Sequence, residues 1–463
     1  MGRTKLIKKS VFHIISLGIL TRILNILNGF LLTYYIVANY NMDVYTLGVS
    51  STVLLTSIVV EGLILALIPV YQEIEMQQGI EGRFKFTNNI INLLILISLG
   101  FMIIGYGLAP VIVKSLGANF GEEEIKQGIR LFRIGIPAIV FHFIRAISAG
   151  YLQGDHRFLA GAKSGVANIS IYILYLLIFK DRFGLEGLAV AGLLAVAIQA
   201  YVLTKPLFKD GYRYKFNINL ERKNYERLVS FLVPIMIFII ITQLDRKIGN
   251  EVVLRFMKGD VLALRYAREI IDFVYGLIIF AIVTVLFPIL AENYNHGNMV
   301  ELKKNINFGI NILLMVAIPI SFVFLVLGNP IVSIIYGKGK LGGEEIIFVA
   351  EILKFYALGL TGMSLSLLIV RIYYAVHDTK TPIFLGLLSL LLNLVLNMVL
   401  VKHMREIGVP LIISITSTII AVLGIYGLNR KANIILPKTF RFLVGGIAAI
   451  ILYGCALLFV FFY

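Results

Sequence analysis

The sequence predicts an all-α polytopic membrane protein, and its composition is the first observation that does so. Of its 463 residues, 59% are hydrophobic and 15% are charged, whereas soluble domains have roughly 45–50% apolar and about 25% charged residues. The mean hydropathy is +0.90. These values exclude a disordered chain, a fibrous protein and an ordinary soluble enzyme, so we expect the function to lie within or across a bilayer.

The second observation is a series of thirteen apolar runs, each bounded by charged residues, glycine or proline. A membrane-spanning helix needs about 20 such residues. The predicted spans are 11–37, 44–71, 88–113, 128–152, 159–179, 185–203, 228–248, 264–290, 305–327, 346–376, 382–401, 407–428 and 439–461. The basic N-terminal segment continues into the first run without a small-residue cleavage site, so we interpret that run as a span and not as a signal peptide.

The third observation is an internal repeat. Three pairs of motifs recur in the same order at a spacing of about 220 residues. They are Leu67–Glu73 with Leu286–Glu292, Pro110 with Pro330, and Tyr151–Arg157 with Tyr374–Lys380. An even number of spans gives both copies the same orientation, as in transporters built from parallel repeats. The predicted domains are a six-helix N-lobe (1–203), a basic cytoplasmic linker (204–227), a six-helix C-lobe (228–428), and a basic loop with an extra helix (429–463), with a fourteenth helix left open.

Loop charge predicts the orientation of the spans. A net charge of +16 would suggest nucleic acid as the partner of a soluble protein, but cytoplasmic loops of membrane proteins are rich in lysine and arginine. The N-terminal tail, the 204–227 loop and the 429–441 loop are basic, whereas the 114–127 loop contains Glu122, Glu123 and Glu124. We therefore expect a multi-pass cell-membrane protein with a cytoplasmic N-terminus, with membrane lipids and not nucleic acid as partners.

An ionisable side chain at bilayer depth is the clearest sign of a functional site, because inserting it costs roughly 2.5–3.5 kcal/mol. Arg22 lies near the middle of the first span, where its side chain cannot easily reach water. It either lines a central cavity or forms a buried ion pair, for which Glu61 of the second span is the candidate. Asn25 and Asn28 extend a polar stripe along the same helix.

A second charged cluster, comprising Arg265, Arg268, Glu269 and Asp272, occupies the first turns of the eighth span. It contains two oppositely charged pairs four residues apart, and such residues are neighbours on a helix surface. The cluster either neutralises itself near the interface or presents a cation to a cavity, and Arg268 is then the first candidate.

Five further residues have less specific assignments. Arg145 and Arg371 lie toward the cytoplasmic ends of the fourth and tenth spans, where each either reaches the interface or faces the cavity. Asp245 ends the seventh span, as part of an interfacial cluster or as an inward ion ligand. Asp155 and Asp378 lie in two matching cytoplasmic turns, as helix-capping residues or as part of an inner gate.

The sequence motifs of common enzymes are absent. There is no Walker A loop, HExxH motif or Ser/His/Asp set, and the one cysteine, Cys455, excludes an internal disulfide and a cysteine metal site. We expect no enzymatic activity and no cofactor, with the membrane potential or an ion gradient as the available energy source. Arginines in a cavity favour a phosphate or diphosphate ligand, which they bind bidentately.

Short motifs spread over residues 10–428 resemble the MurJ/MviN branch of the multidrug/oligosaccharidyl-lipid/polysaccharide exporter superfamily, the lipid II flippases. They are Thr21-Arg22, Asn41–Tyr45, Glu61-Gly62, Ile68-Pro69, Glu73, Tyr266–Arg268, Phe287-Pro288, Tyr336–Lys338, Tyr373–Ala375 and Asp378–Pro382. The resemblance implies two lobes around a cationic cavity. It also implies alternating access that moves undecaprenyl-diphosphate-linked peptidoglycan precursor (lipid II) from the inner to the outer leaflet of a bacterial inner membrane. Arg22 would be the cavity arginine and Asp43 the acidic residue after the first span, with peptidoglycan-synthesis enzymes as candidate protein partners.

The chain departs from the family pattern at several positions. Asn28-Gly29 and Thr56-Ser57 stand where the family has arginine-containing pairs, and Glu269 stands where it has the eighth-span arginine. These departures leave open a flippase for another polyprenyl-linked sugar. Two further alternatives are a cation-coupled multidrug exporter and a non-transporting membrane scaffold for envelope synthesis.

The resemblance also indicates where a metal site would lie. Some family members have a C-lobe sodium site with carboxylates on the seventh and eleventh helices. Here Asp245 supplies the first carboxylate, whereas the eleventh span offers only Asn393 and Asn397. These three residues are the sequence's only candidates for a metal site.

Overall fold

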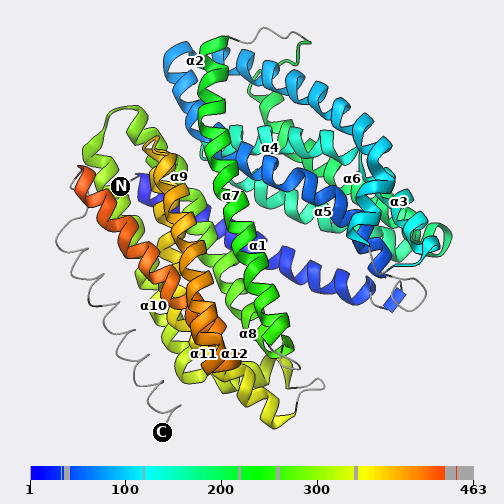
Figure 1. Cartoon of the computed structure of the whole chain (residues 1–463). Coiled ribbons are helices and arrows are strands. Elements are labelled where there is room, and N and C mark those ends of the chain that lie inside the picture. Colours follow the sequence, from blue (N-terminus) through cyan, green and yellow to red (C-terminus); the bar gives the residue numbers. More distant parts are fainter. Residues whose placement is uncertain are drawn as a thin grey trace. The chain divides into compact units, whose positions relative to one another are not determined.

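The computed structural model describes residues 2–32, 34–35, 42–117, 120–216, 221–256, 261–337, 342–432 and 445. Nearly all of these residues are helical and, within these ranges, none forms a β-strand (Figure 1). The all-α prediction is therefore confirmed. Apart from residue 445, the predicted span 439–461 lies outside the described residues, as do Cys455 and Lys338.

The chain divides into two compact units, Met1–Met236 and Ile237–Tyr463, with the division inside α7. The helices of the first unit are α1 (Gly2–Leu32), α2 (Met42–Leu116), α3 (Glu122–Gly135), α4 (Ala138–Gly154), α5 (Leu159–Ile178), α6 (Lys180–Lys209) and the start of α7 (Arg222–Phe256). The second unit continues with α8 (Val261–Val274), the π-helical turn η2 (Tyr275–Ile279), α9 (Phe280–Asn295), α10 (Met299–Tyr336), α11 (Gly343–Ala375) and α12 (Lys380–Ala432). The predicted lobe and linker boundaries stay predictions.

In the first unit, α2 contains two predicted spans that meet at a break. Gly79 has φ 70° and ψ −172°, a conformation open to glycine but strained for residues with a side chain. The two arms contact each other beside this break, where the ring of Tyr71 lies 5.7 Å from that of Phe86. α2 packs against α3 and α4, α4 packs against α6, and α5 packs against both α1 and α6.

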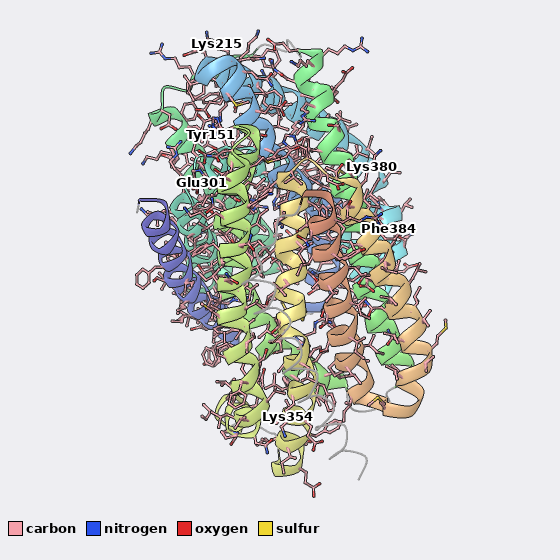
Figure 2. All side chains as sticks on the ribbon, turned by 90° about the vertical axis from the view of Figure 1, so that its left-hand side faces the viewer. Tyr151, Lys215, Glu301, Lys354, Lys380 and Phe384 are labelled. Carbon is pink, nitrogen blue, oxygen red and sulfur yellow. The ribbon has the colours of Figure 1, made fainter. Side chains whose placement is uncertain are left out.

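In the second unit, α11 is the central helix. It packs against α8, α9, α10 and α12, so most of its residues from Val349 onward are buried. The predicted eighth span, 264–290, is a continuous run of α8, η2 and α9, and α12 contains the predicted eleventh and twelfth spans. Figure 2 shows Glu301 and Lys380 toward one end of this unit and Lys354 toward the other, as alternating helix directions require.

The described helices accommodate the first twelve predicted spans. Ten helices are long and apolar enough to cross a membrane, and an eleventh candidate is the pair α3 and α4, which is bent by 42°. One of the ten, Thr56–Leu116, has 61 residues, about three times the length that one span needs. Because this stretch breaks at Gly79, it supplies two spans.

Backbone conformation supports the parallel repeat. His156 (φ 59°) and His377 (φ 62°) are the only non-glycine residues of the described chain with positive φ. Each follows the end of a long helix, in the turns that the sequence matched. The residue after each histidine donates its N–H to a carbonyl five positions earlier, Arg157 to Leu152 at 2.8 Å and Asp378 to Tyr373 at 2.9 Å. This is the hydrogen bond of a Schellman helix end.

The same turns correct one detail of the predicted repeat. Asp155 precedes the positive-φ histidine, whereas Asp378 follows it. The two aspartates therefore do not occupy equivalent positions, and Asp378 corresponds to Arg157. The sequence comparison aligned the two aspartates. The histidine, whose backbone is in the left-handed conformation, is the constrained residue, so it fixes how the two turns align.

Candidate functional site

The predicted first-span cluster lies on α1, which packs against α5. Arg22 and Asn25 are exposed, and the Asn25 amide donates to the Thr21 carbonyl at 2.9 Å. Glu61 on α2 is also exposed, and its pairing with Arg22 stays a prediction. The Asn28 Oδ1 atom is buried without a hydrogen-bond partner among the described residues. Asp43 is exposed in the first turn of α2.

The charged cluster on α8 contains both ion pairs that its spacing predicts. Arg265 Nε lies 3.1 Å from Glu269 Oε1, and Arg268 Nε lies 3.5 Å from Asp272 Oδ2. The Tyr336 hydroxyl also lies 3.4 Å from Glu269 Oε2. Because each arginine has its own carboxylate, an anion that binds here must compete with Glu269 and Asp272.

The two remaining predicted cations are more buried. Arg371 on α11 is 9% exposed, and its guanidinium carbon lies 5.9 Å from the centre of the Phe287 ring. Arg145 on α4 is half-buried, and its Nε has no hydrogen-bond partner in the described part of the chain. A buried donor without an acceptor is unfavourable. The Arg145 Nε–H can therefore donate a hydrogen bond to a bound ligand.

The candidate metal residues lie together in the second unit. Asn393 Nδ2 donates to both carboxylate oxygens of Asp245 at 2.9 Å, and the Ser389 hydroxyl lies 3.4 Å from Asp245 Oδ2. Asn397 Nδ2 donates to the Asn393 carbonyl at 2.6 Å. The side-chain oxygens of Asn393 and Asn397 are buried and have no partner among the described residues. A hard cation prefers oxygen ligands, and here the Asn393 amide nitrogen, not its oxygen, faces the carboxylate. A cation would therefore find both oxygens at Asp245 only after the Asn393 amide turned over.

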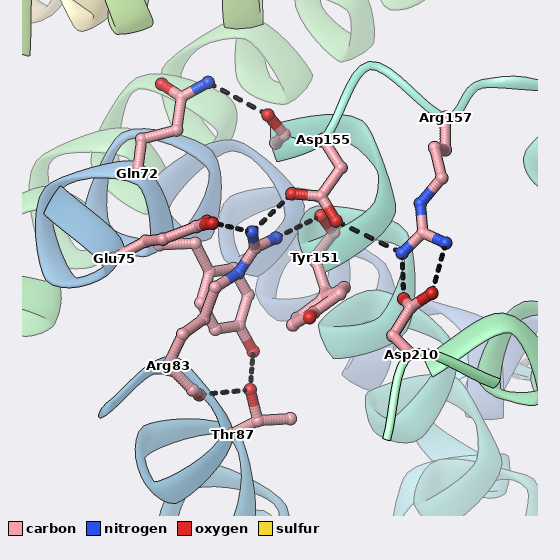
Figure 3. Close-up of polar contacts among 10 residues, drawn as sticks. Gln72, Glu75, Arg83, Thr87, Tyr151, Asp155, Arg157 and Asp210 are labelled. Carbon is pink, nitrogen blue, oxygen red and sulfur yellow. Dashed lines mark hydrogen bonds and ion pairs between the residues drawn. The ribbon is translucent and has the colours of Figure 1, made fainter. Parts of the chain in front are cut away.

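The most densely connected polar cluster is one that the sequence did not predict, and it centres on Arg83 (Figure 3). This side chain is only 1% exposed and forms ion pairs with Glu75 and Asp155. Its Nη2 donates to the Tyr151 carbonyl at 2.6 Å, and its guanidinium lies 3.7 Å from the Tyr151 ring. A buried charge requires such compensation, because leaving it unpaired is strongly unfavourable.

The Arg83 cluster ties the turn after α4 to two other elements. Asp155 pairs with Arg157 at 3.1 Å, and Arg157 pairs in turn with Asp210 at the end of α6. The Gln72 amide donates to the Gly154 carbonyl at 3.1 Å. The turn is therefore fixed both to the hairpin of α2 and to α6. Asp155 therefore joins these elements through its ion pairs and is not only a helix-capping residue.

The hairpin of α2 also contacts the start of α7 within the first unit. Arg227 Nε lies 2.8 Å from Glu73 Oε2. Glu221 accepts hydrogen bonds from Lys85 at 2.9 Å and from Gln78 at 3.2 Å. These bonds, that of Lys85 first, hold the pKa of Glu221 below its usual value.

The corresponding turn of the second unit has a simpler arrangement. Asp378 accepts from the Thr381 backbone N–H at 3.0 Å and from the Thr381 hydroxyl at 2.7 Å. Because α12 begins at Lys380, this is the helix-capping role that the sequence offered as one alternative.

The structure shows the class of fold, which is that of solved polytopic membrane transporters. It resembles a solved "outward-facing conformation of a multidrug resistance MATE family transporter of the MOP superfamily". The TM-score is 0.77, with 14% identity over 93% of this chain and 96% of that one. It also resembles a solved "Lipid II flippase MurJ, inward closed conformation", with a TM-score of 0.61 and 23% identity over 95% of this chain and 92% of that one.

Sequence comparison identifies the family. The family model described as "Lipid II flippase MurJ" matches residues 32–463, so the chain belongs to the MurJ family. A "Probable lipid II flippase MurJ" of Rickettsia prowazekii is 26% identical over 76% of this chain and 69% of that protein. Another from Buchnera aphidicola is 24% identical over 88% of this chain and 81% of that protein. The predicted resemblance is confirmed, and the family is one of transporters and not of enzymes.

Proposed function

We propose that this chain is a lipid II flippase that carries undecaprenyl-diphosphate-linked peptidoglycan precursor from the inner to the outer leaflet by alternating access. The observation that carries the proposal is the family match over residues 32–463. The two-unit transporter fold, with matching turns in each unit, supports it. We place the protein in a bacterial inner membrane with its N-terminus in the cytoplasm, because the basic loops then face the cytoplasm.

Arginines are the proposed ligands of the diphosphate. Arg22 and Arg268 are the primary candidates, since both are at least partly accessible on their helices, and guanidinium groups bind phosphate oxygens bidentately. Arg145 and Arg371 are secondary candidates, and Arg145 has a donor free among the described residues. Arg265 on α8 and Asn25 and Asn28 on α1 are further candidates for substrate binding, while the polyprenyl tail stays in the lipid.

The experiment that tests this function is complementation of a conditional lipid II flippase mutant, with lipid II export measured directly. We expect growth without the resident flippase and export at a rate well above that of an empty vector. Normal expression without export would contradict the proposal and favour another polyprenyl-linked sugar as cargo.

We further propose that a monovalent cation binds at Asp245 and couples its gradient to transport. The carboxylate supports this proposal, and the buried side-chain oxygens of Asn393 and Asn397 would join it once the Asn393 amide turned over. Replacing sodium by N-methylglucamine in reconstituted vesicles is expected to slow transport several-fold. The variant Asp245→Asn is expected to be slow in either medium, because it lacks the charge that binds the cation.

Asp181→Asn is the matched control for this experiment, since Asp181 is 87% exposed and pairs only with the adjacent Lys180 among the described residues. This variant is expected to keep the sodium dependence of the native chain. Sodium dependence that persists in Asp245→Asn would contradict the assignment.

A further inference from the structure

A groove on the first unit combines positive charge with apolar surface. It lies between the turn after α4, the first turns of α5 and the last turns of α6, and has a volume of about 630 Å³. Its lining includes four cations, Arg157, Lys163, Lys205 and Lys209. Among the described residues that line it, none is acidic. The groove therefore favours an anionic ligand.

The charge of the groove comes mainly from its lysines. Arg157 is neutralised by Asp155 and Asp210. Lys163, Lys205 and Lys209 are exposed, and no described carboxylate lies within ion-pair distance of them. Three uncompensated ammonium groups around one groove attract a phosphate, and they can do so without breaking an existing ion pair.

The apolar part of the groove distinguishes a lipid from a free phosphate. Phe158 is buried, whereas Leu159 and Tyr201 are 40% and 62% exposed beside the lysines. Leu159 is also the first residue of an apolar helix long enough to span a membrane. The lysines thus lie where the headgroup region meets the hydrocarbon, and an acyl chain could cover Leu159 and Tyr201.

We propose that this groove binds an anionic phospholipid, with its phosphate at Lys163, Lys205 and Lys209 and an acyl chain against Leu159 and Tyr201. The site is separate from the proposed transport site, because none of the residues assigned to the diphosphate lines it. A bound lipid would hold α5 and α6 together beside the Arg157–Asp210 ion pair.

Native mass spectrometry of the full chain in detergent tests this proposal, with phosphatidylglycerol and phosphatidylcholine as probes. The native chain is expected to retain phosphatidylglycerol preferentially. The triple variant Lys163→Gln, Lys205→Gln, Lys209→Gln is expected to weaken that binding by about tenfold or more, because each lysine near a phosphate contributes. A charge-matched control replaces Lys126, Lys304 and Lys380, which are exposed elsewhere, by glutamine and is expected to bind normally.

Further measurements distinguish a bound phospholipid from inorganic phosphate and from undecaprenyl diphosphate. Inorganic phosphate at equal concentration is expected not to displace the lipid, and Leu159→Asn is expected to weaken lipid binding. Unchanged thermal unfolding in lipid-free detergent would show that the variants are folded. The proposal is overturned if the control loses as much binding as the triple variant, if inorganic phosphate competes fully, or if undecaprenyl diphosphate displaces phosphatidylglycerol from the native chain.

Discussion

Replacing Arg83 by methionine is expected to lower the free energy of unfolding by about 3–5 kcal/mol, the effect of removing one partner from a buried ion pair. The guanidinium is 1% exposed and contacts Glu75, Asp155 and the Tyr151 carbonyl. Methionine keeps most of the side-chain volume but leaves Glu75 and the Tyr151 carbonyl without this donor, and leaves Asp155 with Arg157 alone. Hydrogen–deuterium exchange in detergent would locate the loss, because protection should fall first in the α2 hairpin and in the turn after α4.

The neighbouring change Lys85→Met is the matched control. Lys85 also belongs to the α2 hairpin and pairs with Glu221 at 2.9 Å, but both side chains are largely exposed, at 53% and 41%. Exposed pairs contribute about 0–1 kcal/mol, so this variant should be close to native. Arg83→Lys is expected to recover only part of the loss, since an ammonium cannot reproduce the geometry of the guanidinium. If Arg83→Met lowered the free energy of unfolding no more than Lys85→Met does, the Arg83 cluster would add no more stability than an exposed ion pair.

Much of the fold was predictable because a bilayer imposes one rule on the whole chain. Each span needs about 20 apolar residues in a helix, so the apolar runs locate the helices. The breaks are harder to predict. Gly79 separates the two arms of α2, but a glycine in a polar loop looks the same whether the helix breaks or continues. Likewise, the sequences of the two matched turns do not reveal that the histidines, and not the aspartates, are in equivalent positions.

The residues of the candidate site also include some that the sequence predicts and some that it does not. The two pairs on α8 were predictable, because residues four apart on a helix are neighbours. The Arg83–Asp155 pair joins residues 72 positions apart, so it depends on how α2 and α4 pack. Arg83 also lies between two spans, where a basic residue is equally well explained as one that sets the orientation of the helices in the membrane. The signal available was Gly79 and Gly82 around a strongly charged turn, which indicates a tight hairpin.

Replacing Arg22 by alanine is expected to reduce lipid II translocation in reconstituted vesicles by about tenfold or more, because a charge-assisted hydrogen bond contributes about 1.5–3 kcal/mol. Arg22 is the only arginine of the first span's apolar run, and it lies on an exposed part of α1. Since Arg22 is exposed on α1, the change should alter transport more than stability.

Arg268→Ala tests whether the second unit supplies the other half of the diphosphate site. Its effect should be smaller than that of Arg22→Ala, because Arg268 already pairs with Asp272 at 3.5 Å and must release that partner to bind cargo. For the same reason Asp272→Asn should tighten binding of the diphosphate and slow its release. Arg130→Ala is the control, since Arg130 is 63% exposed and reaches Glu186 only at 3.6 Å. If Arg22→Ala and Arg130→Ala transport lipid II at the same rate, the diphosphate is not recognised on α1.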